Sequence, residues 1–179
     1  MKKQRIQSMI FIALFSTLMC VGAWLHFPSA VPATMQTFVA MTALGLIGSK
    51  NTFIMLLIYI FLGITGLPVF SGFSSGIGAL SGPTAGFIWG FLLGVPVFYL
   101  SQKFIRCRFS LYIGYIIYII LHYITGALWY CYFTTKELTV QGILASSLVT
   151  VVPFIIPDCV KMLLAALTVK RLKKIIKAL

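Results

Sequence analysis

Long runs of apolar residues constrain this chain more than any other feature, because they decide the solvent in which it folds. Of its 179 residues, 60% are hydrophobic and only 9% are charged, whereas a soluble domain carries about 25% charged residues. A helix needs about 20 apolar residues to cross a bilayer. The sequence therefore predicts a single all-α, polytopic domain embedded in a membrane and in contact with lipid over most of its surface.

Six hydrophobic segments are predicted to be transmembrane helices. They cover approximately residues 6–26, 34–48, 51–67, 83–102, 111–133 and 140–170. The second is short for a full span, and the tight turn from Gly48 to Asn51 makes it a hairpin with the third. The first has the basic start of a signal peptide, but its apolar run is too long for one, so we interpret it as a retained helix.

Basic residues occur in every second connection, and this pattern orients the helices because cytoplasmic loops are enriched in Lys and Arg. The basic segments are the N-terminus, the turn at Lys50, the 103–108 loop and the tail from Lys170, and the remaining loops are 27–33, 68–82 and 134–139. The first two of these loops carry no charge, and in the third Lys136 stands beside Glu137. We therefore expect both termini in the cytoplasm and these three loops outside.

The chain has 14 Lys and Arg residues against two acids, a net charge of +12. Such a balance also occurs in nucleic-acid-binding proteins. Here, however, the basic residues form short clusters between apolar runs, which fits loops and a tail at an anionic membrane surface. We expect no nucleic-acid partner.

The sequence offers little chemistry for an enzyme. Its four cysteines form no C-x-x-C pair, and no metal-binding cluster is present. The segment LIGSKN (residues 46–51) lacks the spaced glycine and the Ser or Thr of a phosphate-binding loop. We therefore expect no ATP hydrolysis by this chain, and no metal or cofactor.

The last apolar segment contains VVPFIIPDCVKMLLAAL (residues 151–167), with both an acid and a lysine. Asp158 and Lys161 are three residues apart and therefore share one face of a helix. A charge at membrane depth costs at least about 2.5 kcal/mol on insertion scales, so such residues mark functional sites by default. Pro153 and Pro157 leave nearby carbonyls without helical partners, which is tolerated where the chain lines a cavity.

Two interpretations of this pair stay open. It is either an ion pair that pins the last helix in the bundle or a ligand site, which we favour. A carboxylate beside an ammonium suits a neutral ligand that has N–H donors and a C=O acceptor. Thr34, Gln36 and Thr37 are weaker candidates. We expect His122 to be a hydrogen-bonded residue of the bundle, and the tyrosines of residues 112–132 to lie partly in an interfacial aromatic belt.

Glycine recurs at every fourth position near the middle of the chain. These glycines are at positions 78, 82, 86, 90 and 94. From position 82 onward they fall on one face of the predicted fourth helix, where small residues let a neighbouring helix come close in lipid. The preceding stretch SGFSSGIG (residues 71–78) lies in an uncharged outer loop. It is predicted to be a lid over a binding pocket.

Three stretches carry a resemblance to a known family. The segment GLPVFSGFSSGIGALSGPTAGFIWGFLLG (residues 66–94) resembles the signature of BioY, the biotin-capturing S component of energy-coupling-factor (ECF) transporters. VPATMQTFVAMTAL (residues 31–44) is similar to the start of the family's second helix, and PDCVKMLLAAL (residues 157–167) to its final helix. Together they span most of the chain, from residue 31 to residue 167, in the family's order.

The resemblance implies a six-helix subunit of a prokaryotic plasma membrane that binds biotin from outside. It implies as partners a transmembrane coupling subunit and two cytoplasmic ATPases. The substrate-binding set is then Asp158, Lys161, Gln36, Ser71, Gly72, Ser74, Ser75 and Gly76. Asp158 would accept an N–H of the ureido ring, Lys161 would donate to its C=O, and the valerate carboxylate would meet the loop or the start of the fourth helix.

The family docks its coupling subunit through an A-x-x-x-A motif in the first helix, which this chain lacks. Ala13-x-x-x-Thr17 and Ser16-x-x-x-Cys20 are the available substitutes. Alternatives to a biotin S component are an S component for another vitamin, a self-sufficient carrier or channel, and a structural subunit without a ligand.

Overall fold

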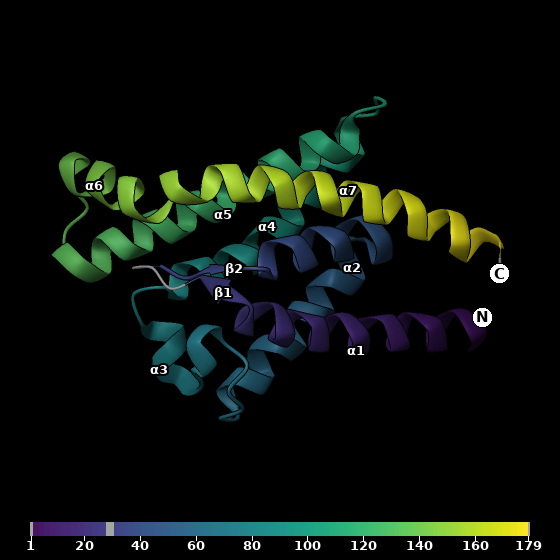
Figure 1. The fold of residues 1–179 in the computed structure, drawn as a ribbon, viewed down its shortest axis with the longest axis horizontal. Helices are drawn as coiled ribbons and strands as arrows, with labels where there is room; N and C mark the ends of the chain where they lie inside the picture. Colours follow the sequence, from purple (N-terminus) through teal and green to yellow (C-terminus); the bar gives the residue numbers. More distant parts are fainter. Residues whose placement is uncertain (1, 28–30, 179) are drawn as a thin grey trace.

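Helices make up almost all of the secondary structure in the computed structural model, which describes residues 2–27 and 31–178 (Figure 1). The elements are α1 (Lys2–Trp24), β1 (His26–Phe27), β2 (Ala33–Thr34), α2 (Gln36–Ile64), η1 (Ser71–Phe73), α3 (Gly76–Ser81), α4 (Ala85–Phe104), α5 (Ser110–Thr135), α6 (Val140–Thr150), η2 (Val152–Phe154) and α7 (Ile155–Ala178). Within these residues, five helical stretches are long and apolar enough to cross a membrane: α1, α2, α4, α5 and α6 with α7. The predicted 27–33 loop includes residues 28–30, which lie outside the described residues.

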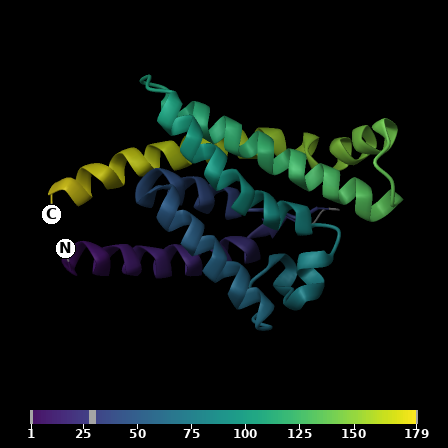
Figure 2. The same ribbon diagram turned by 180° about the vertical axis from the view of Figure 1, so that it is seen from behind.

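The helix α2 consists of two arms that meet at Gly48. This glycine has φ 79° and ψ 165°, a conformation outside the helical region, and glycine adopts positive φ without steric cost. Figures 1 and 2 show the chain of α2 turning back on itself. The two arms correspond to the hairpin predicted for residues 34–48 and 51–67, and the second arm ends at Ile64.

The segment predicted as one helix over residues 140–170 is divided in the structure. Helix α6 ends at Thr150, the 3-10 turn η2 follows, and α7 begins at Ile155. Pro153 lies within η2 and Pro157 in the first turn of α7, where a missing backbone N–H removes no helical hydrogen bond. After the break, the first turn of α7 places Asp158 in the buried interior of the bundle.

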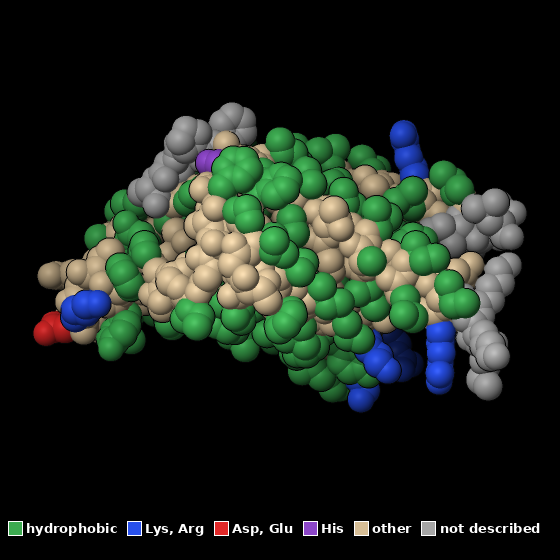
Figure 3. Space-filling model, turned by 90° about the horizontal axis from the view of Figure 1, so that it is seen from below, with side chains coloured by type: hydrophobic (Ala, Val, Ile, Leu, Met, Phe, Trp, Pro, Cys, Tyr) green, Lys and Arg blue, Asp and Glu red, His purple; other side chains and the backbone are tan. Residues whose placement is uncertain are grey.

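Both ends of the chain lie at the same end of the bundle, as Figure 1 shows. The strands β1 and β2 pair in an antiparallel ribbon toward the other end, close to α3. The surface seen in Figure 3 is mostly hydrophobic along its middle, and most of its Lys and Arg side chains are gathered toward the end with the termini. This distribution fits a bundle surrounded by lipid, with polar ends in water.

Helices α4 and α5 pack side by side (Figures 1 and 2) through glycines on both helices. Gly86, Gly90 and Gly94 of α4 face Trp129, Thr125 with His122, and Tyr118 of α5, and Gly114 and Gly126 of α5 face Phe98 and Phe87 of α4. The predicted close approach at the glycine row is thereby confirmed for the three glycines within α4. Gly82 precedes that helix and forms the C-cap of α3.

A side chain at Gly94 should disrupt this interface. A Cβ atom there would lie 2.6 Å from Tyr118 Cδ2, so we expect Gly94→Leu to lower the free energy of unfolding by about 1–3 kcal/mol. Thermal unfolding in detergent measures the loss. Gly78→Leu is the control, because a Cβ there meets nothing within 4 Å. Equal stability of the two variants would contradict the packing role of Gly94.

Candidate ligand-binding site

A cavity of about 200 Å³ lies inside the bundle. Its roof is formed by part of the cap segment, a name used here for residues 65–84 between α2 and α4. The polar wall is formed by Thr34, Gln36, Thr37, Tyr123, Asp158 and Lys161, and the aromatic wall by Phe70, Phe87, Phe91, His122 and Phe154. Such a combination of apolar walls and a few converging polar groups is typical of small-molecule sites.

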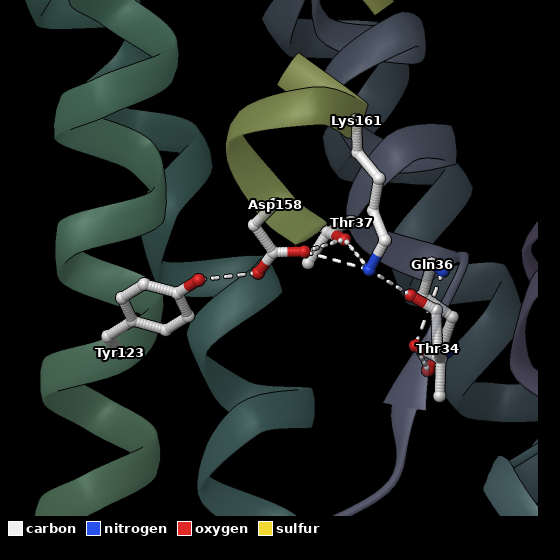
Figure 4. Close-up of polar contacts among 6 residues, drawn as sticks. All are labelled: Thr34, Gln36, Thr37, Tyr123, Asp158 and Lys161. Carbon is white, nitrogen blue, oxygen red and sulfur yellow. Dashed lines mark hydrogen bonds and ion pairs between the residues drawn. The ribbon is translucent and has the colours of Figure 1, made fainter. Parts of the chain in front are cut away.

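Asp158 is the centre of the polar wall and is only 4% exposed. Its Oδ1 accepts hydrogen bonds from Lys161 Nζ at 2.8 Å and from Thr37 Oγ1 at 2.9 Å. Its Oδ2 accepts one from Tyr123 OH at 2.6 Å, as Figure 4 shows. Three helices, α2, α5 and α7, therefore converge on one carboxylate, which compensates for the loss of water around a buried charge.

Lys161 is held by three acceptors, as many as its ammonium has protons. Besides Asp158, Nζ donates to the carbonyl oxygen of Thr34 at 2.7 Å and contacts Thr37 Oγ1 at 3.3 Å. The side chain thus links α7 to β2 and to the start of α2 (Figure 4). The paired charges predicted from their spacing are brought together, with Thr37 and Tyr123 as additional partners.

Gln36 lies beside this cluster and connects it to the base of the cap segment. Its Oε1 accepts a hydrogen bond from Thr34 Oγ1 at 3.1 Å, and its Nε2 donates to Tyr59 OH at 2.7 Å. Tyr59 OH in turn donates to the carbonyl of Val69 at 3.2 Å. The predicted ligand residue Gln36 therefore lines the cavity and also supports its roof.

The predicted lid residues divide into two groups. Ser71 and Ser74 line the cavity, whereas Gly72, Ser75 and Gly76 are not among its lining residues. Gly72 and Gly76 have φ of 68° and 78° and shape the turns around η1 and α3. The buried Ser71 Oγ has no hydrogen-bond partner within the described part of the chain, so its hydroxyl has free capacity for a ligand.

All three tryptophans of the chain hold the cap segment in place. Their indole N–H groups donate to cap carbonyls: Trp24 to Pro68 at 2.8 Å, Trp89 to Leu80 at 3.2 Å, and Trp129 to Gly82 at 2.9 Å. The Trp24 ring also stacks on Phe73 with centroids 5.5 Å apart. Helices α1, α4 and α5 therefore each contribute one tether to the roof of the cavity.

Two residues of the aromatic and polar walls differ from expectation. Tyr123, one of the tyrosines predicted to lie partly in an aromatic belt, is a direct partner of Asp158. His122, which was expected to be hydrogen-bonded, is 5% exposed, and its Nδ1 has no partner among the described residues. Residue type alone did not separate these two from the neighbouring aromatic residues of α5, because a contact with α7 is a property of the folded bundle.

The two candidate docking motifs of α1 face different ways. Ser16 and Cys20 are buried, and Ser16 Oγ lies 3.3 Å from the carbonyl oxygen of Met55 in the second arm of α2. Ala13 and Thr17 are exposed on the outside of α1. Of the two motifs, only Ala13-x-x-x-Thr17 is accessible to another subunit.

Comparison with known proteins gives consistent results. The sequence model of the BioY family matches residues 1–178. The chain is 32% identical over 178 residues to the biotin transporter BioY of Thermotoga maritima, covering 95% of this chain and 98% of that protein. It is 32% identical over 171 residues to the biotin transporter BioY2 of Lactococcus lactis subsp. cremoris, covering 93% and 90%. A solved S-component for biotin from an ECF-type ABC transporter has a TM-score of 0.82 at 23% identity, covering 97% of this chain and 94% of that one.

The apolar helices and the internal cavity define a multi-pass membrane protein built to hold a small ligand. The chain belongs to the BioY family, because the family model and relatives above 30% identity both cover nearly all of it. The resemblance inferred from the three motifs is confirmed, and the fold matches that of a solved S-component.

Loss of a tryptophan tether should loosen the roof of the cavity. Trp129→Phe keeps the packing of the side chain but removes the donor to Gly82 O, and one hydrogen bond contributes about 1 kcal/mol. We expect amide hydrogen exchange within residues 71–82 to rise about fivefold. Tyr132→Phe, an exposed position on the same helix, is the control. Unchanged exchange in Trp129→Phe would show that the indole does not hold the cap.

Proposed function

We propose that this chain is the biotin-binding, substrate-capture subunit of an ECF-type transporter in a prokaryotic cell membrane. Membership of the BioY family supports this, as do relatives named as biotin transporters. The observation that carries the proposal is the buried carboxylate of Asp158 in the wall of the cavity. It gives a ligand with N–H donors a strong acceptor away from competing water.

The hydrogen bonds of Asp158 leave room for such a ligand. The carboxylate accepts three protein hydrogen bonds, whereas an ionised carboxylate has about four lone-pair sites. The ureido ring of biotin carries two N–H donors and one C=O acceptor, so one N–H can occupy the remaining site. Lys161 holds the carboxylate in place through the ion pair at 2.8 Å.

The rest of the ligand fits the other walls of the cavity. Apolar and aromatic side chains from α4, η2 and the cap suit the thiophane ring and the aliphatic tail. The valerate carboxylate would lie under the cap segment, where the Ser71 hydroxyl has no partner among the described residues and Ser74 lines the cavity. Gly72, Ser75 and Gly76 would then act by shaping the lid, through the turns around η1 and α3.

Transport would require partners, because this chain lacks a nucleotide-binding motif. A transmembrane coupling subunit and two cytoplasmic ATPases would supply the energy. The termini share one end of the bundle (Figure 1), and the basic residues near them favour the cytoplasmic side. The cap segment at the opposite end would then face the outside, where biotin arrives.

The first prediction for this function concerns Asp158. Replacing it with asparagine leaves Lys161 without its counter-ion and removes the charged acceptor, so we expect Asp158→Asn to weaken biotin binding at least about tenfold. Titration of the purified protein with biotin measures this. Glu137→Gln, which neutralises the only other acid at an exposed loop, should bind as the wild type does.

Thiamin or riboflavin binding in place of biotin would reassign the ligand, and gradient-driven uptake by the chain alone would indicate a self-sufficient carrier.

A second prediction concerns the coupling subunit. We propose that it packs on the exposed Ala13 and Thr17 of α1, because small residues allow close contact between membrane helices. Ala13→Trp should then reduce co-purification of the coupling subunit severalfold without changing biotin affinity. Ile120→Trp, at an exposed position of α5, serves as the control. If Ala13→Trp assembles as well as the control, the docking surface lies elsewhere.

A further inference from the structure

His122 is a buried polar residue of the cavity whose hydrogen-bonding capacity the bundle leaves unused. It lies in α5 directly before Tyr123, lines the cavity, and is 5% exposed. Its Nδ1 has no partner among the described residues. Nε2 also makes no hydrogen bond within the described part of the chain, and unlike Nδ1 it is not fully enclosed by protein. Because His122 lines the cavity, a ligand there can reach Nε2 and satisfy a polar atom that the bundle leaves unpaired.

The packing around the ring fixes its position. The imidazole lies against Phe91 with ring centroids 4.3 Å apart and planes inclined by 30°, and Phe87 approaches it at 5.3 Å. On the side of α4, Gly90 has no side chain, and a Cβ atom there would lie 3.1 Å from Nδ1. The glycine row therefore makes room for the histidine, and its two phenylalanine neighbours are themselves residues of the cavity wall.

The same packing indicates which nitrogen carries the proton. Nδ1 faces α4 at Gly90, and no acceptor for an N–H lies beside it within the part of the chain that the structure describes. A buried N–H without an acceptor is rarer than an acceptor without a donor. The neutral ring therefore carries its proton on Nε2, which remains as the donor available to the cavity.

In the polar wall, the ammonium group of Lys161 has no proton free for a ligand. Lys161 already contacts Thr34 O, Thr37 Oγ1 and Asp158 Oδ1, so its protons are all engaged. Asp158, in contrast, still has acceptor capacity. A ligand that has an N–H next to a C=O could therefore donate the N–H to Asp158 on α7. The donor to its carbonyl oxygen would be His122 on α5.

We propose that His122 Nε2–H donates a hydrogen bond to the carbonyl oxygen of the bound ureido ring while Asp158 accepts one of its N–H groups. This inference rests on the proposed function and assigns the head group to a position between α5 and α7. His122 is then a ligand-contacting residue that selects for a carbonyl acceptor, and Lys161 mainly fixes Asp158 and β2.

A comparison of two ligands on two proteins tests this. The ligands are biotin and its thione analogue, in which sulfur, a weak acceptor, replaces the ureido oxygen. We expect the wild type to prefer biotin by about tenfold or more, and His122→Phe to reduce that preference to about twofold. His122→Gln, whose amide can still donate, should retain part of the preference. Thermal unfolding confirms that each variant is folded, and His122→Leu replaces His122→Phe if the latter is not.

The matched control is Phe154→Leu, which alters the aromatic wall at a residue of η2 without removing a polar group. It should weaken both ligands to a similar extent and leave their ratio unchanged. An unchanged ratio in His122→Phe, or equal affinities of the two ligands for the wild type, would overturn the role of His122. Failure of the wild type to bind biotin at all would instead refute the proposed function, so the two failures are distinguishable.

Discussion

The buried charge of Asp158 is the constraint on which the rest of this structure depends. A carboxylate inside a membrane protein costs several kcal/mol unless it is paired and hydrogen-bonded. Lys161, Thr37 and Tyr123 supply that compensation from α7, α2 and α5. Satisfying this group therefore requires three helices to meet at one point, and removal of any partner leaves a charge poorly compensated.

The helix packing makes this meeting point possible. Glycines on α4 and α5 receive large side chains from the opposite helix, so these two helices approach closely without a hydrophobic driving force between them. The break at Gly48 turns α2 back on itself, and the break before Ile155 places the buried Asp158 in the first turn of α7. The cavity is what remains between these elements, and the cap segment closes it under three tryptophan tethers.

Preformed walls under a roof held by hydrogen bonds suit the capture of a small molecule. Preformed walls reduce the entropy lost when a ligand binds, and a roof held by a few hydrogen bonds can open at modest cost. The network from Lys161 through Thr34, Gln36 and Tyr59 to Val69 joins the polar wall to the base of that roof. The polar wall and the position of the cap are therefore physically connected.

The sequence alone determined the membrane-embedded helical class, the hairpin at Gly48, the glycine packing face and the pairing of Asp158 with Lys161. These follow from hydropathy, periodicity and spacing, which are local properties of the chain. Only the tertiary structure decided that Tyr123 and Thr37 join the pair, that the tryptophans hold the cap, and that Ser16 and Cys20 face inward. It also left Nδ1 of His122 without a hydrogen-bond partner among residues 2–27 and 31–178, contrary to expectation. These outcomes depend on contacts between residues far apart in sequence, such as the 121 positions between Thr37 and Asp158, and no local pattern encodes which side chains meet.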